Sequence, residues 1–388
     1  MATQSKRCVQ YLAHGAARVG LVAVSALLAG ILGVLALLLF WSYPGRPNPF
    51  FDDHGTPLPR GLSEKLFIEI NGVMQGLIIE SKDTSHPVLL YLHGGLPDYF
   101  LSKHYPTGFE DLFTVVWWEQ RGAGLSYSPD IPKESLTTEQ YIADTLALTD
   151  YLRHRFGQER IYLMAHSGGT FFGIQAAARA PERFHAYIGV AQMTNQLRSE
   201  QLAYQYMLQR FRESGDADMV RKLEAAPVTL EGGAPPAYLA VRDSAMHRLG
   251  VGTMHTMTSI VQGLFLASLQ TREYTLGEKV ALWRGKLAAG VSALWEEQVS
   301  TDLAETLPVV DVPVYLLHGT YDYTVSFPLA KAYCEQIRAP IKGFYTFEQS
   351  AHSPMFEEPS RTVRILRDDV LAGTARLADA PLEVAQGG

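Results

Sequence analysis

The sequence is poor in cysteine, with only Cys8 and Cys334 among 388 residues. A long apolar stretch separates the two, so no disulfide between them is expected. No C-x-x-C or H-E-x-x-H pattern occurs, and we expect no metal or other cofactor. No basic stripe accompanies the net charge of −7, which argues against nucleic acid as a partner. No internal repeat is visible, and nothing indicates an oligomeric state.

Apolar residues are abundant, at 47%, and their longest uncharged run extends over 27 residues from Val19 to Gly45. As a helix this run would be about 40 Å long, enough to cross about 30 Å of hydrocarbon with some tilt. A cleavable signal peptide is the alternative, but its apolar region would be shorter. The end of the run carries Phe40, Trp41 and Tyr43, which are typical of an interfacial anchor. We therefore predict an uncleaved transmembrane helix and the lipid bilayer as a partner.

Charged residues flank this run unequally. Three basic residues precede it, and two basic residues that follow are accompanied by two aspartates: Lys6, Arg7 and Arg18, then Arg46, Arg60, Asp52 and Asp53. The positive-inside rule predicts a single-pass protein with a cytoplasmic N-terminus and an extracytoplasmic main domain.

Strand-like runs follow a tether at residues 44–62 that is rich in proline and glycine. Leu66–Ile70 and Val73–Glu80 flank Asn71-Gly72, which favours a tight hairpin because both turn residues tolerate positive φ. Further apolar runs of buried-strand length come later: Val88–Leu92, Phe113–Trp118, Ile161–Ala165, Tyr187–Ala191, Val314–His318 and Phe344–Phe347.

Helical patterns separate several of these runs. One helix is expected over Glu139–Arg155, because Thr137 and Gln140 form a capping-box pattern before it and Gly157 follows it. Apolar strands that alternate with helices predict an α/β fold, with a mostly parallel sheet covered on both faces. Residues 196–306 interrupt the alternation with mostly helical sequence, and we interpret them as a cap.

These boundaries give the expected domain organisation. It comprises an N-terminal segment (1–18), a transmembrane anchor (19–43), a linker (44–62), the first part of the core (63–195), the helical cap (196–306), the second part of the core (307–374) and a tail (375–388). The small, mixed residues from about Leu371 onwards are expected to fray.

The motif Ala165-His166-Ser167-Gly168-Gly169 lies between a strand-like and a helix-like run. A nucleophile elbow holds a serine on a tight, strained strand-to-helix turn and needs small residues two positions to either side. The common pattern is G-x-S-x-G, and Ala165 differs from the first glycine by one methyl group. A serine in an ordinary glycine-rich turn is the alternative, but the flanking strand and helix favour Ser167 as a nucleophile.

Enzymes with such an elbow carry an acid and then a histidine after the serine. His352 is the last histidine of the chain and follows the last strand-like run, so we predict it as the general base. Asp322 follows the preceding strand and is predicted to accept the Nδ1–H of His352. Asp302 and Asp311 lie before that strand, at its wrong end.

The motif His93-Gly94-Gly95 ends another strand-like run. The backbone N–H groups of Gly95 and Gly168 are predicted to converge on a developing oxyanion. His93 itself is interpreted as a turn residue.

Together with Trp118-Glu119-Gln120-Arg121-Gly122-Ala123-Gly124-Leu125-Ser126, these motifs resemble the proline iminopeptidase-like branch of the α/β-hydrolase family. The similarity covers roughly Leu66–Asn195 and Val312–Leu371, with the cap between them. It implies the α/β-hydrolase fold and a serine hydrolase that cleaves an ester, amide or short-peptide bond through an acyl-enzyme. In that family a cap glutamate holds the free amine of the substrate. Three glutamates of the insertion, Glu200, Glu296 and Glu297, are candidates that we cannot match to it.

Two departures from the family pattern bear on the substrate. Leu96-Pro97 stand where the family has P-G, and Gly168 stands where it has a tryptophan. Gly168 is expected to open space beside Ser167. Methionines of the cap and the aromatic residues Tyr204, Tyr206, Phe211 and Phe265 are expected to form an adaptable apolar roof. The alternative for each of them is that it fills the core of the cap itself. The sequence therefore favours a hydrophobic acyl group over an N-terminal aminoacyl group.

Other functions remain as alternatives. The resemblance favours a proline iminopeptidase-type aminopeptidase, and an acyltransferase would use the same three residues. A non-catalytic binding module is disfavoured because all three residues occur in order. The expected partner of the site is a small molecule or a short peptide.

Overall fold

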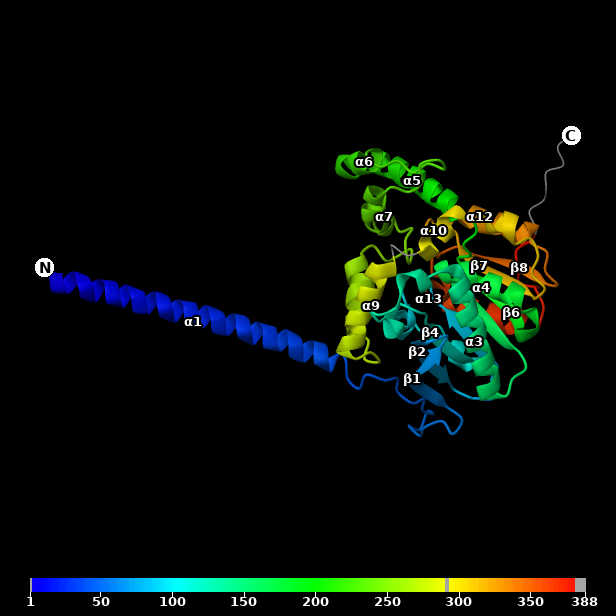
Figure 1. Ribbon diagram of the computed structural model, residues 1–388, viewed down its shortest axis with the longest axis horizontal. Coiled ribbons are helices and arrows are strands. Elements are labelled where there is room, and N and C mark those ends of the chain that lie inside the picture. The colour runs from blue at the N-terminus through cyan, green and yellow to red at the C-terminus, as the bar shows by residue number, and fades with distance from the viewer. Residues whose placement is uncertain (1, 290–292, 381–388) are drawn as a thin grey trace.

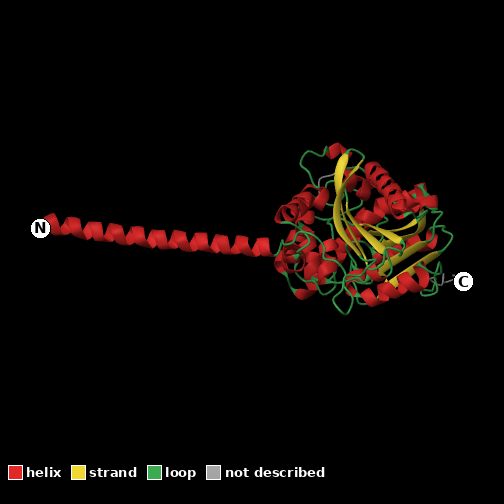
Figure 2. Ribbon diagram, turned by 90° about the horizontal axis from the view of Figure 1, so that it is seen from below, coloured by secondary structure: helices red, strands yellow, loops and turns green. Residues whose placement is uncertain are grey.

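The computed structural model describes residues 2–289 and 293–380. Helix α1 (Ala2–Phe40) extends away from the rest of the chain, in which helices surround a twisted sheet (Figures 1 and 2). The described strands form one eight-stranded sheet in the order β1-β2-β4-β3-β5-β6-β7-β8. Their bounds are Leu62–Ile70 (β1), Val73–Ser81 (β2), Val88–Leu92 (β3), Thr114–Glu119 (β4), Ile161–His166 (β5), Phe184–Val190 (β6), Val314–Gly319 (β7) and Lys342–Phe347 (β8).

Most neighbouring strands are parallel. Only β1 with β2 and β2 with β4 pair in antiparallel fashion within the described sheet, so the mostly parallel sheet predicted from the sequence is confirmed. Asn71 and Gly72 form the turn between β1 and β2 with φ of 46° and 78°, as the hairpin pattern predicts. Because the parallel strands point the same way, the segments that follow β3, β5, β7 and β8 gather at one edge of the sheet.

Helices cover both faces of this sheet (Figure 2). Outside the cap the α-helices are Tyr99–His104 (α2), Thr138–Phe156 (α3), Gly168–Arg179 (α4), Phe327–Gln336 (α12), Pro354–Glu357 (α13) and Pro359–Ile365 (α14). The shorter 3₁₀ and π turns are Phe109–Asp111 (η1), Gly124–Ser126 (η2), Lys133–Ser135 (η3), Pro181–Arg183 (η4) and Leu366–Val370 (η6).

Helix α3 begins and ends close to the predicted residues. The Thr137 hydroxyl accepts a hydrogen bond from the Gln140 N–H, and Gly157 ends the helix with φ of 63°. The Gln140 side chain donates to Asp144 and does not cap Thr137, so only half of the expected capping box forms. The charged Asp144 carboxylate is a strong acceptor for the Gln140 amide N–H, and this hydrogen bond orients the amide group towards Asp144 instead of the Thr137 N–H.

The side chains of each central strand alternate between two hydrophobic cores, as the two-residue period of a strand requires. In β3, Leu90 and Leu92 pack with side chains of α3 and α4, whereas Leu89 and Tyr91 pack with side chains of α2 and α14. The sheet is therefore buried on both faces.

The insertion between β6 and β7 contains Gln196–Ser214 (α5), Ala217–Glu224 (α6), Pro236–Arg248 (α7), Val261–Leu266 (η5), Ala267–Gln270 (α8), Leu276–Ala289 (α9), Ala293–Ser300 (α10) and Leu303–Thr306 (α11). Helices α5 to α7 enclose a core of their own, which includes Met207 and Phe211. Later residues such as Met254, Met257 and Leu282 join the core on one face of the sheet. Met207 and Phe211 are therefore interior residues of the cap, so for Phe211 the alternative of a core residue holds and not that of a pocket roof.

Helix α1 contains an uncharged stretch, Gly20–Phe40, of 21 residues with a mean hydropathy of 2.7 and no buried residue. At 1.5 Å per residue it is about 31 Å long, which matches the hydrocarbon layer of a bilayer. Its length and composition are those of a membrane span or a signal sequence.

The residues after η6 are more ordered than the sequence suggested. Asp369 accepts hydrogen bonds from the Thr374 hydroxyl and from the Arg376 and Leu377 N–H groups. Asp379 accepts from the Thr346 hydroxyl of β8. The expectation of fraying from Leu371 is therefore wrong for residues 371–380, and residues 381–388 lie outside the described chain.

Candidate active site

Ser167 stands on the turn between β5 and α4. Its φ of 54° and ψ of −127° lie in a region that side chains rarely adopt, which is the strained backbone that a nucleophile elbow requires. Gly169 allows α4 to approach the end of β3 closely, because a methyl group there would lie 2.4 Å from the His93 carbonyl oxygen. The residue types of the motif thus fit the tight turn.

Ala165 replaces the usual first glycine of the motif. It fits because Gly173 of α4, which packs against it, has no side chain. Ala165 is fully buried in β5, and a methyl group placed on Gly173 of α4 would lie 3.0 Å from its Cβ. Gly173 therefore provides the space that a glycine at position 165 would otherwise provide.

This compensation gives a stability prediction. Gly173→Ala should lower the free energy of unfolding by about 1–3 kcal/mol, because the added methyl group is forced against Ala165. Gly277→Ala of α9 is the control, because its methyl group would meet no atom within 4 Å. Thermal unfolding in detergent measures both, and the double variant Ala165→Gly/Gly173→Ala should recover much of the loss. An unchanged or raised Tm for Gly173→Ala would contradict this account.

His352 and Asp322 come together at the edge of the sheet where Ser167 lies. The Nδ1 of His352 is 2.9 Å from Asp322 Oδ2, and the other carboxylate oxygen accepts hydrogen bonds from the Thr324 and Val325 N–H groups. His318 Nε2 lies 3.1 Å from the same Oδ2. The sequence did not single out His318, although it begins the segment His318-Gly319-Thr320-Tyr321-Asp322.

The charges of this pair are set by burial and by contact. Burial alone would raise the pKa of Asp322, but the neighbouring His352 and the hydrogen bonds from His318 and His352 hold it well below its usual range. Burial lowers the pKa of His352, and the Asp322 carboxylate opposes this only in part. Near neutral pH the pair is therefore a carboxylate beside a neutral imidazole.

Ser167 and His352 share this edge of the sheet, but no hydrogen bond joins them among the described residues. His166, next to Ser167 in the chain, connects the two segments because its Nε2 lies 3.0 Å from the His352 carbonyl oxygen. Its Nδ1 lies 2.8 Å from Asp98, which also accepts from the Tyr91 hydroxyl. Both nitrogens of His166 face acceptors, so it ties the His352 loop to the layer beneath the elbow. Asp98 and His166 were not predicted, because their contact links positions 68 residues apart.

The loop after β3 lies against the elbow. A methyl group placed on Gly94 would lie 2.6 Å from Ser167 Cβ and 3.2 Å from the Gly168 nitrogen. Within the described chain, the N–H groups of Gly95 and Gly168 donate to no turn or loop acceptor. Their role as oxyanion donors stays a prediction.

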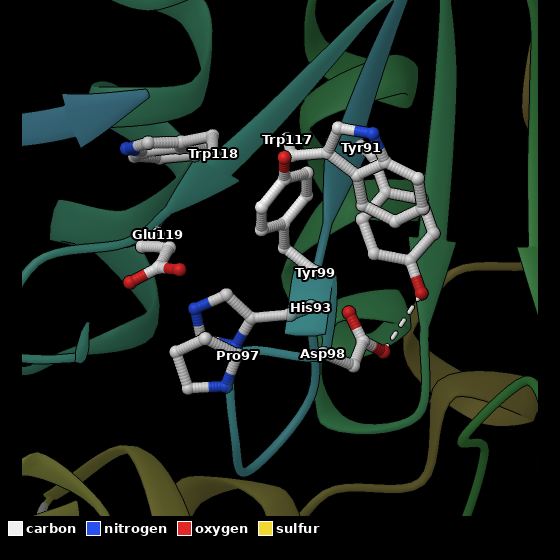
Figure 3. Close-up of a pocket in the computed structure, with 8 residues that line it drawn as sticks. All are labelled: Tyr91, His93, Pro97, Asp98, Tyr99, Trp117, Trp118 and Glu119. Carbon is white, nitrogen blue, oxygen red and sulfur yellow. Dashed lines mark hydrogen bonds between the residues drawn. The ribbon is translucent and has the colours of Figure 1, made fainter. Parts of the chain in front are cut away.

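A packed polar layer lies beneath this loop and includes Tyr91, His93, Asp98 and Glu119 (Figure 3). These residues and their neighbours enclose no room for a water molecule, so the layer is a support and not a substrate pocket. His93 Nε2 accepts from the Gln120 N–H, and burial lowers the pKa of His93 to about 4. His93 is thus a neutral turn residue. Burial raises the pKa of Glu119 to about 7, against hydrogen bonds from Tyr274 and the Leu125 N–H.

The cap places two polar side chains next to Gly168 and Gly95, the residues predicted to form the oxyanion hole. Gln298 of α10 donates to the Gly168 carbonyl at 3.1 Å, and its amide nitrogen lies 3.2 Å from where a Gly168 methyl group would be. Gln298 therefore occupies space that the sequence suggested would be open. Lys286 of α9 holds its ammonium 3.4 Å from the corresponding point on Gly95.

The three candidate cap glutamates are placed differently. Glu200 is fully buried and accepts hydrogen bonds from Arg242, Tyr238 and Gln196. Glu297 accepts from the Thr138 N–H at the start of α3, and Glu296 is exposed. Glu200 and Glu297 are therefore engaged in contacts within the protein. Among the described residues, no group of three or more His, Cys, Asp or Glu side chains is arranged to hold a metal ion.

Comparison with known proteins defines the class. Residues 87–359 match the family described as the alpha/beta hydrolase fold, so the chain belongs to this family and is a hydrolase. A protein of Bacillus subtilis (strain 168), described as the probable aminopeptidase YbaC, is 32% identical over 300 residues, which cover 76% of this chain and 92% of that protein. The membership of the α/β-hydrolase family that the sequence motifs indicated is therefore confirmed.

Two solved structures have the same fold. The proline iminopeptidase of Mycobacterium smegmatis aligns with a TM-score of 0.55 and 16% identity, over 80% of this chain and 99% of that one. A proline iminopeptidase-related protein of Thermus thermophilus aligns with a TM-score of 0.50 and 18% identity, over 81% and 99% of the two chains.

Proposed function

We propose that the chain is a serine hydrolase that forms an acyl-enzyme on Ser167. His352 Nε2 takes the proton of Ser167 Oγ as this oxygen attacks the carbonyl carbon of the substrate. Asp322 keeps the Nδ1 of His352 protonated and stabilises the imidazolium. His352 then returns the proton to the leaving alcohol or amine, and water releases the acyl group by the same route. The observation that carries this proposal is the 2.9 Å contact between His352 and Asp322 at the sheet edge that bears the strained elbow.

The Gly95 and Gly168 N–H groups would stabilise the oxyanion. The support for this role is the packing of Gly94, the neighbour of Gly95, against Ser167 and against the Gly168 nitrogen. One such donor contributes about 3 kcal/mol to the transition state in enzymes where it has been removed.

The surroundings of Ser167 favour an acyl ester without a free amine over an aminoacyl substrate. The Lys286 ammonium, next to Gly95, would repel the free amine of an aminoacyl substrate. Glu200, a candidate to hold that amine, is instead neutralised by Arg242 at 2.6 Å.

An aminopeptidase is the second candidate, and the relative in Bacillus subtilis favours it. Asp243 of α7 is the candidate to hold the amine, because its side chain is half exposed and pairs with Arg242 through only one carboxylate oxygen, at 2.7 Å. Partial burial would raise the pKa of Asp243, but Arg242 and then Lys286 hold this pKa below its usual value.

A comparison of substrates separates the two candidates. We expect kcat/KM to be at least about tenfold higher for medium-chain acyl esters than for prolyl and alanyl arylamides at one pH. Lys286→Gln should lower the ratio of these two kcat/KM values, because the variant removes the charge that repels the amine of the arylamide. A preference for arylamides that Asp243→Asn abolishes would establish the aminopeptidase instead, with Asp218→Asn on the cap surface as the control.

We also propose that α1 anchors the protein in a membrane, with the hydrolase domain outside the cytoplasm. The support is the length of the uncharged stretch Gly20–Phe40 and the basic residues that precede it. A membrane-impermeant thiol reagent should then label a cysteine introduced at the exposed Glu159 in intact cells.

A further inference from the structure

The end of α1 rests on the cap. Lys279 of α9 donates to the Trp41 carbonyl at 2.8 Å and to the Ser42 hydroxyl at 3.0 Å. Arg272 donates to the Tyr43 carbonyl at 3.0 Å. Two cations therefore meet the carbonyl end of α1, where the helix dipole is negative. Lys279 is only 1% exposed, so this junction is a packed contact, and α9 lies beside it in Figure 1.

The part of the cap that adjoins the junction has no formal charge. The 23 residues of Leu249–Thr271 contain no Asp, Glu, Lys or Arg. They end in a continuous apolar helical stretch, Val261–Gln270, formed by η5 and α8. This stretch reaches the junction because the Leu269 carbonyl accepts a hydrogen bond from Lys279 at 2.6 Å.

Large apolar side chains of this stretch face outwards. Val261, Phe265 and Leu266 are 60%, 40% and 39% exposed, and we call these three residues the cap patch. Val261 and Phe265 are four positions apart and so lie on one side of a helical stretch. Clustered apolar exposure of this kind marks a surface that binds a partner or a membrane.

We propose that the cap patch lies on the surface of the bilayer that α1 spans. The inference rests on the proposed anchoring by α1, whose interfacial end is marked by Trp41 and Tyr43. The stretch Val261–Gln270 is about 15 Å long, and its C-terminal end is bonded through Lys279 to the interfacial end of α1. The cap patch therefore lies within about 15 Å of the headgroup layer. A short uncharged helix with exposed Val, Leu and Phe inserts favourably between headgroups.

Depth-dependent fluorescence quenching tests this contact. Single cysteines are placed at Val261 or at Glu159 of the full chain, in a Cys8→Ser/Cys334→Ala background, and carry a small fluorophore. Glu159 precedes β5 and lies at the opposite end of the parallel strands from Ser167, which makes it the control. In phosphatidylcholine–phosphatidylglycerol vesicles with nitroxide near the headgroups, quenching at position 261 should exceed that at 159 at least about threefold. A label at Phe265 provides a second measurement at the same surface.

Three results would overturn the proposal. Equal quenching at positions 261 and 159, in protein that stays with the vesicles, would place the cap patch in water. Quenching at 261 by nitroxide on other copies of the chain, without labelled lipid, would identify a protein interface. Release of the full chain from vesicles by an alkaline wash would refute the anchor, whereas turnover of a water-soluble ester by the released protein would leave the proposed chemistry intact.

Discussion

Replacing Ser167 by alanine should abolish labelling by a fluorophosphonate probe and lower turnover by about six orders of magnitude. The loss is large because nucleophile, base and acid act as a unit, so that removal of one disables the others. Labelling is measured on the full chain in detergent by gel fluorescence, and turnover with the best ester of the substrate panel.

The control for this variant is Ser85→Ala. Ser85 is an exposed serine before β3, at the opposite end of the parallel strands from the elbow, and its removal should leave labelling and turnover unchanged. Labelling that survives Ser167→Ala, or turnover within about tenfold of the wild type, would show that another residue is the nucleophile.

Asp322→Asn should lower kcat/KM by about 10⁴-fold, because an amide favours the wrong tautomer of His352 and cannot stabilise the imidazolium. The pH profile should change as well. His352 must be neutral to accept a proton, so activity falls as pH drops through its pKa. Burial lowers this pKa and the Asp322 carboxylate opposes the shift. Without the carboxylate the pKa falls further, and the acid limb of kcat/KM should move to lower pH.

Asp311→Asn is the matched control for this measurement. Asp311 is an exposed aspartate that precedes β7, whereas Asp322 follows it, so the same change there should leave rate and profile as they were. An acid limb that stays in place in Asp322→Asn, with a rate loss below about tenfold, would remove Asp322 from the mechanism.

The sequence predicted those parts of the site that depend on neighbouring residues. The hairpin at Asn71-Gly72 and the elbow at Ser167 are set by a few adjacent residues whose backbone demands are specific. The partners His352 and Asp322 could be chosen because the order of strands and loops leaves few candidates. Their 2.9 Å contact agrees with that choice, although their catalytic roles stay a prediction.

Contacts between distant segments could not be predicted in this way. The contact of His166 with Asp98 and the approach of Lys286 to Gly95 depend on how loops and cap helices are placed in space. Helical periodicity indicated that the cap is helical, but it could not show which core each apolar face joins. For the same reason Gln298, an ordinary residue of a helical stretch, gave no sign that it would fill the space beside Gly168.

Helix α9 connects the end of α1 to the loop after β3 that packs against Ser167. Lys279 holds the end of α1, and seven residues further along, Lys286 stands beside Gly95. Gly285 also packs against the turn after β4, where a methyl group would lie 2.8 Å from the Gly122 carbonyl oxygen. The Lys279 and Lys286 contacts are about 10 Å apart along the same α-helix. Helix α9 thereby couples the end of α1 to the loop beside Ser167, so a displacement at one contact would be transmitted to the other.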